Sequence, residues 1–229
     1  MTGPVLDVRA LGIAFGGLKA VDQVSFSAQR NRITTVIGPN GAGKSTLFNL
    51  ISGALKPKSG QLLIDGVDMT GASPARTKAA GLSRSFQITN LFFELTVAEN
   101  LRMAAQVLEP KALAFLPLRR SIRALAKTAE MLERFHLGHK RDEFAGNLSH
   151  GDQRRLEIAV CLASEPKILL LDEPTQGMSH ADTADTAALV RELSRDVSVL
   201  LIEHDIGLVM DLSDHVVVMH QGRKLAEGP

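Results

Sequence analysis

Short, nearly continuous runs of apolar residues recur in the last third of the chain, and stretches with helical spacing separate them. The runs lie at 168–171, 197–202 and 216–219, and helices are expected at 181–195 and 206–212. Strands without a polar face are typical of a parallel sheet that helices cover on both sides. The pattern therefore predicts an α/β fold.

The N-terminal part adds a different kind of strand. Two loosely alternating stretches, 5–15 and 21–28, flank the turn Gly16-Gly17 and predict a pair of antiparallel strands. We therefore expect an N-terminal antiparallel β subdomain. The remaining expected elements of the core are strands at 33–38, 61–65 and 82–87, a helix at 44–54, and a hairpin around Gln221-Gly222.

The middle of the chain has helical spacing instead. Helices are expected at 97–107, at 120–137 and within 147–164. We therefore predict a single domain in which 1–87 and 166–229 form the core and 88–165 form an inserted α-helical subdomain. The residues that carry the spacing in 120–137 are Ile122, Leu125, Ala126, Ala129, Leu132 and Phe135.

Composition narrows the function classes. The formal net charge is +1, which argues against an extended nucleic-acid interface. Cys161 is the only cysteine, so no internal disulfide is possible and a reducing compartment is favoured. The N-terminus lacks the pattern of a signal peptide, and every apolar run is shorter than the ~20 residues that span a bilayer. We expect a chain that does not cross a membrane but can dock onto a protein that does.

A glycine-rich loop carries the strongest chemical signal. The pattern G-x-x-x-x-G-K-[ST] lies between an expected strand and an expected helix, as a phosphate-binding loop (P-loop) requires. Its residues are Gly38, Pro39, Asn40, Gly41, Ala42, Gly43, Lys44 and Ser45. Glycines let backbone N–H groups curl around phosphates, and the helix N-terminus favours negative charge. The pattern predicts bound ATP, with Lys44 at the β/γ-phosphates, Ser45 on Mg²⁺ and Thr46 on another phosphate oxygen.

Two carboxylates follow a buried strand. Asp172 and Glu173 come directly after 168–171. Ligand sites in parallel sheets lie at the carboxyl ends of strands, so we expect this pair to meet the P-loop across neighbouring strands. Asp172 would hold Mg²⁺, mainly through water, and Glu173 would activate the attacking water as general base. The alternative is an acidic turn or helix cap after a core strand.

Six segments in one order resemble the nucleotide-binding subunit of an ATP-binding cassette (ABC) transporter, over essentially the whole chain. Besides the P-loop and the acidic pair, they include Phe15, Gln87, the signature 148–153 and His204. The resemblance implies that Phe15 stacks on adenine, although a core strand Phe is the alternative. It also implies that Gln87 touches Mg²⁺ and the attacking water, and that His204 contacts the γ-phosphate.

The signature segment implies a second subunit. Ser149 and Gly151 match the residues that bind the γ-phosphate held by the partner, so the resemblance implies a head-to-tail dimer, homo- or heteromeric, with ATP between its subunits. His150 and Asp152 depart from the usual L-S-G-G-Q, and Ser179 stands where the family often has Asp. These departures leave the contacts around the phosphate and the cross-talk between sites open.

The resemblance also implies two transmembrane permease subunits, an extracytoplasmic solute-binding protein that acts through them, and a peripheral location on the cytoplasmic face of the inner membrane. A cluster of large apolar residues, Leu91 to Phe93, is expected at the permease interface, with subdomain core as the alternative.

A narrower match points to the subunits that energise import of branched-chain amino acids. It rests on 15–21, 85–87 with Leu91 and Phe92, the helical stretch 102–136, 154–159 and 202–205. Importers of urea and short-chain amides share much of this texture and stay an alternative. ABC ATPases that act outside transport, in DNA repair or on the ribosome, are a further alternative. P-loop kinases are another, but the signature and His204 argue against a kinase.

Overall fold

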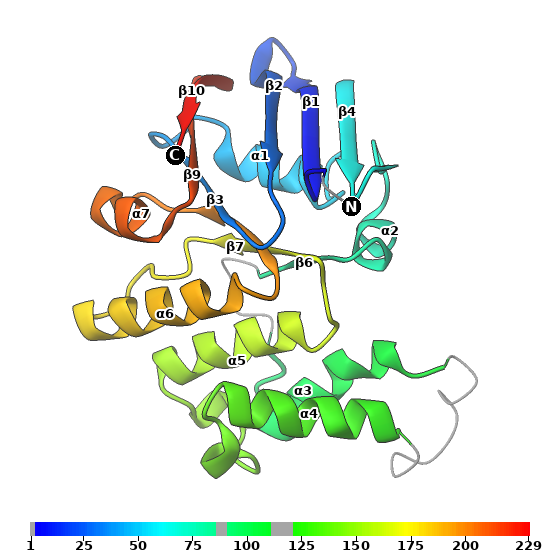
Figure 1. Cartoon of the computed structure of the whole chain (residues 1–229), viewed down its shortest axis with the longest axis vertical. Coiled ribbons are helices and arrows are strands. Elements are labelled where there is room, and N and C mark those ends of the chain that lie inside the picture. Colours follow the sequence, from blue (N-terminus) through cyan, green and yellow to red (C-terminus); the bar gives the residue numbers. More distant parts are fainter. Residues whose placement is uncertain (1–2, 86–90, 111–120) are drawn as a thin grey trace. The chain divides into compact units, whose positions relative to one another are not determined.

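The computed structural model describes residues 3–85, 91–110 and 121–229, and the chain divides into two compact units (Figure 1). The core unit comprises Met1–Arg84, Pro166–Gln176 and Thr183–Pro229, and the helical unit comprises Ser85–Glu165 and Gly177–Asp182. The segment Gly177–Asp182, which the sequence prediction assigns to the core, clusters with the helical unit.

The core unit contains a six-stranded sheet of order β10-β9-β3-β8-β7-β6. Its strands pair in parallel except for β10, which runs antiparallel to β9. The central strands β7 and β8 are buried at every position, so the α/β prediction is confirmed. The bounds are β3 (Ile33–Ile37), β6 (Leu82–Arg84), β7 (Ile168–Asp172), β8 (Ser198–Ile202), β9 (His215–His220) and β10 (Arg223–Gly228).

One expectation about this sheet is wrong. Strands β3 and β7, which lead into the P-loop and the acidic pair, are not neighbours, because β8 lies between them. The register aligns Ile202 of β8 with Val36 on one side and with Asp172 on the other. The chain therefore crosses over when it returns to the sheet, and the end of β8 separates the two motifs.

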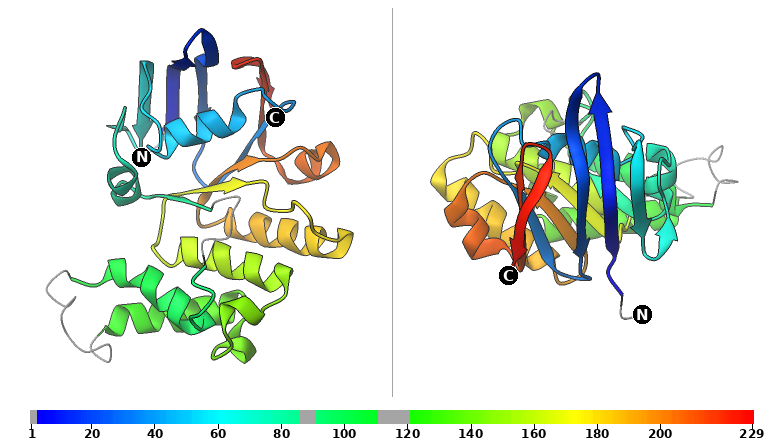
Figure 2. Two further views of the ribbon diagram at one scale, coloured as in Figure 1. Left: turned by 180° about the vertical axis from the view of Figure 1, so that it is seen from behind. Right: turned by 90° about the horizontal axis from the view of Figure 1, so that it is seen from above.

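A second, antiparallel sheet of order β2-β1-β4-β5 completes the strands described in the core unit. Figure 2 shows β2, β1 and β4 running side by side. Its strands are β1 (Leu6–Phe15), β2 (Leu18–Ala28), β4 (Ser59–Ile64) and the short β5 (Val67–Asp68). The predicted N-terminal antiparallel pair is confirmed, with irregular register where Ala10 and Gln23 adopt positive φ.

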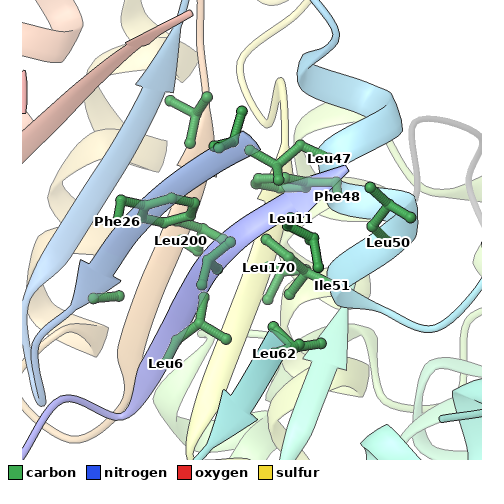
Figure 3. Close-up of a cluster of buried hydrophobic side chains, with 14 of the residues drawn as sticks. Leu6, Leu11, Phe26, Leu47, Phe48, Leu50, Ile51, Leu62, Leu170 and Leu200 are labelled. Atoms are coloured by element: carbon green, nitrogen blue, oxygen red, sulfur yellow. The ribbon is translucent and has the colours of Figure 1, made fainter. Parts of the chain in front are cut away.

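Helix α1 (Lys44–Ile51) contributes to the main hydrophobic core of this unit. Figure 3 shows its Leu47, Phe48 and Ile51 packed with residues of both sheets, among them Leu11 and Leu170. The sequence predicts that this helix ends near Gly53; it ends at Ile51, and Gly53 turns the chain at φ +80° just after it. The other helices are α2 (Pro74–Ala79), α7 (Ile206–Leu212) and α6 (His180–Leu193), whose residues up to Asp182 belong to the helical unit.

The helical unit contains α3 (Val97–Ala105), α4 (Ile122–Arg134) and α5 (His150–Leu162). Short 3₁₀ turns lie at η1 (Gln106–Leu108), η4 (Gly138–Lys140) and η5 (Ala145–Asn147). In α4 the predicted apolar face is only partly buried, since Leu132 is in the core but Ile122 and Leu125 are exposed. Ala124, Thr128 and Met131 are buried in their place. Among the described residues, no helix has the length and apolar character that crossing a bilayer requires.

Candidate nucleotide-binding site

The glycines of the P-loop are demanded by its geometry. Gly38 has φ +152°, and a Cβ there would lie 2.2 Å from the carbonyl oxygen of Met219. Gly43 has φ +96°, and its Cβ would lie 2.3 Å from the carbonyl oxygen of Ala20. Backbone atoms cannot move aside as a flexible side chain can, so both positions exclude any larger residue. The loop is a tight cradle between β2, β9 and α1.

The N-terminus of α1 is suited to an anion. Gly43 is its N-cap and supplies no side-chain hydrogen bond, and the first turn holds no acidic residue. The first helical bond runs from the N–H of Leu47 to the carbonyl of Gly43. The amides of Lys44, Ser45 and Thr46 precede that bond and have no partner within the helix. Three N–H groups at the positive end of the helix dipole are an arrangement that suits a phosphate.

The ammonium group of Lys44 lies within this loop. The residue is buried, and its Nζ donates to the carbonyl oxygens of Gly38 at 2.7 Å and Pro39 at 3.2 Å. These bonds hold the charge at the loop's own backbone, where it can meet a bound phosphate. Ser45, the next residue, is exposed.

The β9–β10 turn is hydrogen-bonded to the P-loop, a contact that the sequence did not predict. Gly222 donates to the carbonyl of Ala42 at 3.0 Å and accepts from the N–H of Asp22 at 2.7 Å. The Asp22 carboxylate in turn accepts from Arg223 Nη2 at 2.7 Å. This contact with Arg223 lowers the pKa of Asp22. Two segments far apart in sequence thus hold the loop in shape.

Phe15 ends β1 and pairs with Leu18 across the turn. Half of its surface, 50%, is exposed, so the alternative of a core residue is wrong. An exposed aromatic ring offers a flat apolar face on which a base can stack.

Asp172 ends β7 and is paired with a residue that the sequence analysis missed. Arg84 Nη2 donates to Asp172 Oδ2 at 3.1 Å, and both side chains are almost completely buried. Arg84 also donates to Asn49 Oδ1 in α1 at 2.7 Å and to Oγ of Ser52, the C-cap residue of α1, at 3.1 Å. Burial lowers the pKa of the Arg84 guanidinium, and the neighbouring Asp172 carboxylate offsets part of that effect. Arg84 therefore fixes the carboxylate relative to α1.

Glu173 and His204 lie at the carboxyl ends of adjacent strands. Glu173 adopts φ +47°, an uncommon conformation for a residue with a side chain, and its N–H donates to Ile202 at 3.0 Å. His204 Nδ1 lies 4.0 Å from Glu173 Oε1. The His204 side chain is 60% exposed, so its ring is accessible from solvent. Strained backbone of this kind recurs at functional sites.

Glu203 is a second residue that the sequence analysis did not single out. Its side chain is fully buried, and Oε1 accepts from the Thr175 hydroxyl at 2.7 Å and from the Thr175 N–H at 3.3 Å. Its Oε2 accepts from the N–H of His204 at 3.3 Å. Glu203 thus ties the loop that follows Glu173 to the loop that carries His204.

Ser149 and Gly151 belong to the helical unit, where they begin α5. Ser149 is the N-cap, and its Oγ accepts from the N–H of Asp152 at 3.2 Å. Gly151 lies near Asp182, whose Oδ1 would be 3.5 Å from a Cβ at that glycine. The structure therefore gives the signature a helix N-terminus, as expected.

In the core unit, the structure gathers the P-loop, Asp172, Glu173 and His204 at the carboxyl ends of β3, β7 and β8. Gln87 lies outside the described residues, so its contact with Mg²⁺ stays a prediction. The residue types fit ATP with Mg²⁺. A glycine cradle and helix amides suit phosphates, and serine hydroxyl and carboxylate oxygens are the ligands that Mg²⁺ prefers.

Comparisons with known proteins show the family of the chain. A model of the family described as ABC transporter matches residues 21–176. The chain is 42% identical to the high-affinity branched-chain amino acid transport ATP-binding protein BraF of Pseudomonas aeruginosa, over 100% of this chain and 92% of that protein. It is 41% identical to the corresponding protein LivG of Escherichia coli K12, with the same coverage.

Solved structures show the same fold. A nucleotide-free ATP-binding cassette from an ABC transporter has a TM-score of 0.87 at 34% identity, covering 99% of this chain and 91% of that one. The ADP conformation of the cassette MJ1267 has a TM-score of 0.87 at 33% identity, with the same coverage. The fold and the site define a P-loop ATPase. Within that class, this chain belongs to the ABC transporter family, as an ATP-binding subunit.

Proposed function

We propose that this chain binds ATP with Mg²⁺ and hydrolyses it as one of two nucleotide-binding subunits of an importer of branched-chain amino acids. The observation that carries the proposal is the gathering of the P-loop, Asp172, Glu173 and His204 at one edge of the parallel sheet. The substrate rests on the likeness to BraF and LivG, whose names specify branched-chain amino acids.

The phosphates of ATP lie in the cradle of Gly38 to Gly43. The amides at the start of α1 donate to phosphate oxygens, and Lys44 adds a positive charge that is already held in the loop. Thr46 donates to a further oxygen. Phe15 stacks on the adenine, which accounts for an aromatic ring left half exposed at a strand end.

Ser45, Asp172 and Gln87 hold Mg²⁺ in this proposal. When bound there, the ion would neutralise charge on the β- and γ-phosphates. Arg84 occupies one oxygen of Asp172, so the carboxylate would not hold the ion through both of its oxygens.

Hydrolysis places a water in line with the γ-phosphate, and Glu173 accepts its proton. The proximity of Glu173 Oε1 to His204 Nδ1, 4.0 Å, brings a base and a potential phosphate ligand to the same end of the sheet. His204 donates to the γ-phosphate from its exposed position. Glu203, through Thr175 and the His204 N–H, holds both loops in register.

A second subunit completes the site. Ser149 and Gly151 of the partner donate to the γ-phosphate from a helix N-terminus, so two subunits pair head to tail around ATP. Closure on ATP and reopening after hydrolysis then drive alternating access in two permease subunits.

The permease contact lies on exposed aromatic residues of the helical unit. Leu91 is buried, but Phe92 and Phe93 are 57% and 46% exposed, and Phe144 is 51% exposed. Phe93 accepts at its carbonyl from the N–H of Gly146 at 3.1 Å, which places it beside the segment of Phe144. An exposed aromatic cluster of this kind suits a partner protein. The chain then works at the cytoplasmic face of the inner membrane, and the solute-binding protein acts through the permeases.

Reconstitution with the co-purifying membrane subunits tests this function. The chain and those subunits are placed in vesicles with the solute-binding protein, and uptake of leucine is measured with internal ATP. ATP-dependent uptake of leucine supports the proposal. Uptake of urea or a short-chain amide instead would replace the substrate, and absence of any co-purifying membrane protein would overturn the transport role.

A further inference from the structure

The signature serine is engaged by a neighbouring carboxylate. Ser149 Oγ donates to Asp152 Oδ2 at 2.6 Å, and the N–H of Asp152 donates back to Ser149 Oγ at 3.2 Å. A hydroxyl carries a single hydrogen. While that hydrogen points at Asp152, Ser149 cannot donate to a phosphate.

A lysine holds the same carboxylate oxygen. Lys140 Nζ donates to Asp152 Oδ2, and the two side chains are 25% and 18% exposed. Burial by itself raises the pKa of Asp152, but the Lys140 ammonium and the Ser149 hydroxyl outweigh it and keep the pKa below its ordinary value. The carboxylate is thus charged, and it lies at the helix N-terminus where an anion is favoured.

We propose that the Asp152 carboxylate competes with the γ-phosphate of the partner's ATP for the Ser149 hydroxyl, and that Lys140 limits this competition by holding the carboxylate. The inference rests on the proposed pairing of two subunits. A phosphate that approaches Ser149 must replace Asp152 as the acceptor of the Ser149 hydroxyl hydrogen. The phosphate also meets the negative charge of Asp152, which the glutamine usual at this position does not carry. Asp152 is therefore a positioning residue that sets how readily the two subunits close on ATP.

The test uses the Glu173→Gln background, in which we expect ATP to be held without turnover. Mass measured after size-exclusion chromatography gives the ATP concentration at which half of the chain is dimeric, with Mg²⁺ present. Asp152→Gln is expected to lower that concentration about three- to ten-fold, the range that one hydrogen bond and one exposed charge contact account for. Asp152→Asn, which keeps the side chain short, is expected to act in the same direction.

Lys140 separates competition from simple helix capping. With Asp152 unchanged, Lys140→Met is expected to raise the ATP concentration for half dimerisation (the dimerisation midpoint) about three-fold, because the carboxylate loses its counter-charge. In the Asp152→Gln background the same change is expected to have little effect. If Lys140 and Asp152 only stabilised the fold, Lys140→Met would change the unfolding midpoint, and its effect on dimerisation would not depend on residue 152.

Asp142→Asn is the matched control. It removes one negative charge two residues from Lys140, and its side chain is 92% exposed. The ATP concentration at which half of the Asp142→Asn variant is dimeric should not change. An unchanged midpoint in both Asp152 variants, or an equal effect of Lys140→Met in both backgrounds, would overturn the inference alone. Complete absence of an ATP-dependent dimer in the background variant would overturn the pairing, and the inference with it.

Discussion

Arg84 Nη2 lies 3.1 Å from Asp172 Oδ2, and the two side chains are 9% and 2% exposed. This ion pair joins the ends of the neighbouring strands β6 and β7, and through Asn49 it also reaches α1. It is the most deeply buried ion pair described at the nucleotide site. The position of the proposed magnesium ligand therefore depends on an arginine from another strand.

Replacing Arg84 should destabilise the protein strongly. Arg84→Met leaves the Asp172 carboxylate without this buried counter-charge, and loss of one partner of such a pair costs about 3–5 kcal/mol of unfolding free energy. Urea denaturation followed by circular dichroism measures it. Arg9→Met is the matched control, because Arg9 pairs with Asp7 at 2.7 Å but is 57% exposed. The control should cost at most about 1 kcal/mol. Equal losses in the two variants would contradict the importance of burial.

Gly43→Ala should abolish ATP binding. The new methyl group would lie 2.3 Å from the Ala20 carbonyl at φ +96°, so the loop must shift away from its cradle. Binding of a fluorescent ATP analogue measures the effect. Gly138→Ala is the control, since a Cβ there has no heavy atom within 4 Å. Normal affinity in Gly43→Ala would show that the loop geometry does not determine binding.

Lys44→Ala should lose ATP binding or hydrolysis. The substitution removes the only side-chain charge within the P-loop, at the position where phosphate charge is greatest. Release of inorganic phosphate and nucleotide binding are measured together. The variant should keep its fold, because the hydrogen bonds that it loses, to Gly38 and Pro39, lie within one loop and do not join separate elements. ATPase kinetics equal to those of the unchanged chain would refute the role of the loop.

Glu203→Ala should lower both stability and turnover. Thr175 loses the acceptor for its hydroxyl and N–H, and leaving such donors unsatisfied costs about 1–3 kcal/mol. The loops that carry Glu173 and His204 then lose their link, so turnover per folded molecule should fall as well. Thr175→Val removes only the hydroxyl bond and should have a smaller effect on both. A variant that is less stable but turns over normally would restrict Glu203 to stability.

Much of the core could be predicted because its signals are local. The apolar runs of β7 and β8 lack a polar face, and the spacing of Gly38, Gly43 and Lys44 forms a recognisable pattern. Even the missed helix α2 carries a local signal, since Ser73 precedes Pro74 at its first position.

The contacts that hold the site together could not be predicted, because they join residues far apart in sequence. Arg84 meets Asp172, and Glu203 meets Thr175, only after the strands have assembled. The same reason explains the strand order, in which β8 separates the P-loop from the acidic pair. Exposure of Ile122 and Leu125 shows a further limit, since apolar spacing does not reveal which face of a helix finds a partner.

Glu173→Gln gives the most direct test of the catalytic account. The amide keeps the shape of the side chain but cannot accept a proton from water. Phosphate release and molecular mass are measured on the same sample with ATP and Mg²⁺. We predict that the variant binds ATP, releases no phosphate and accumulates as an ATP-bound dimer. Unchanged phosphate release in the variant would contradict the role of Glu173 as the general base.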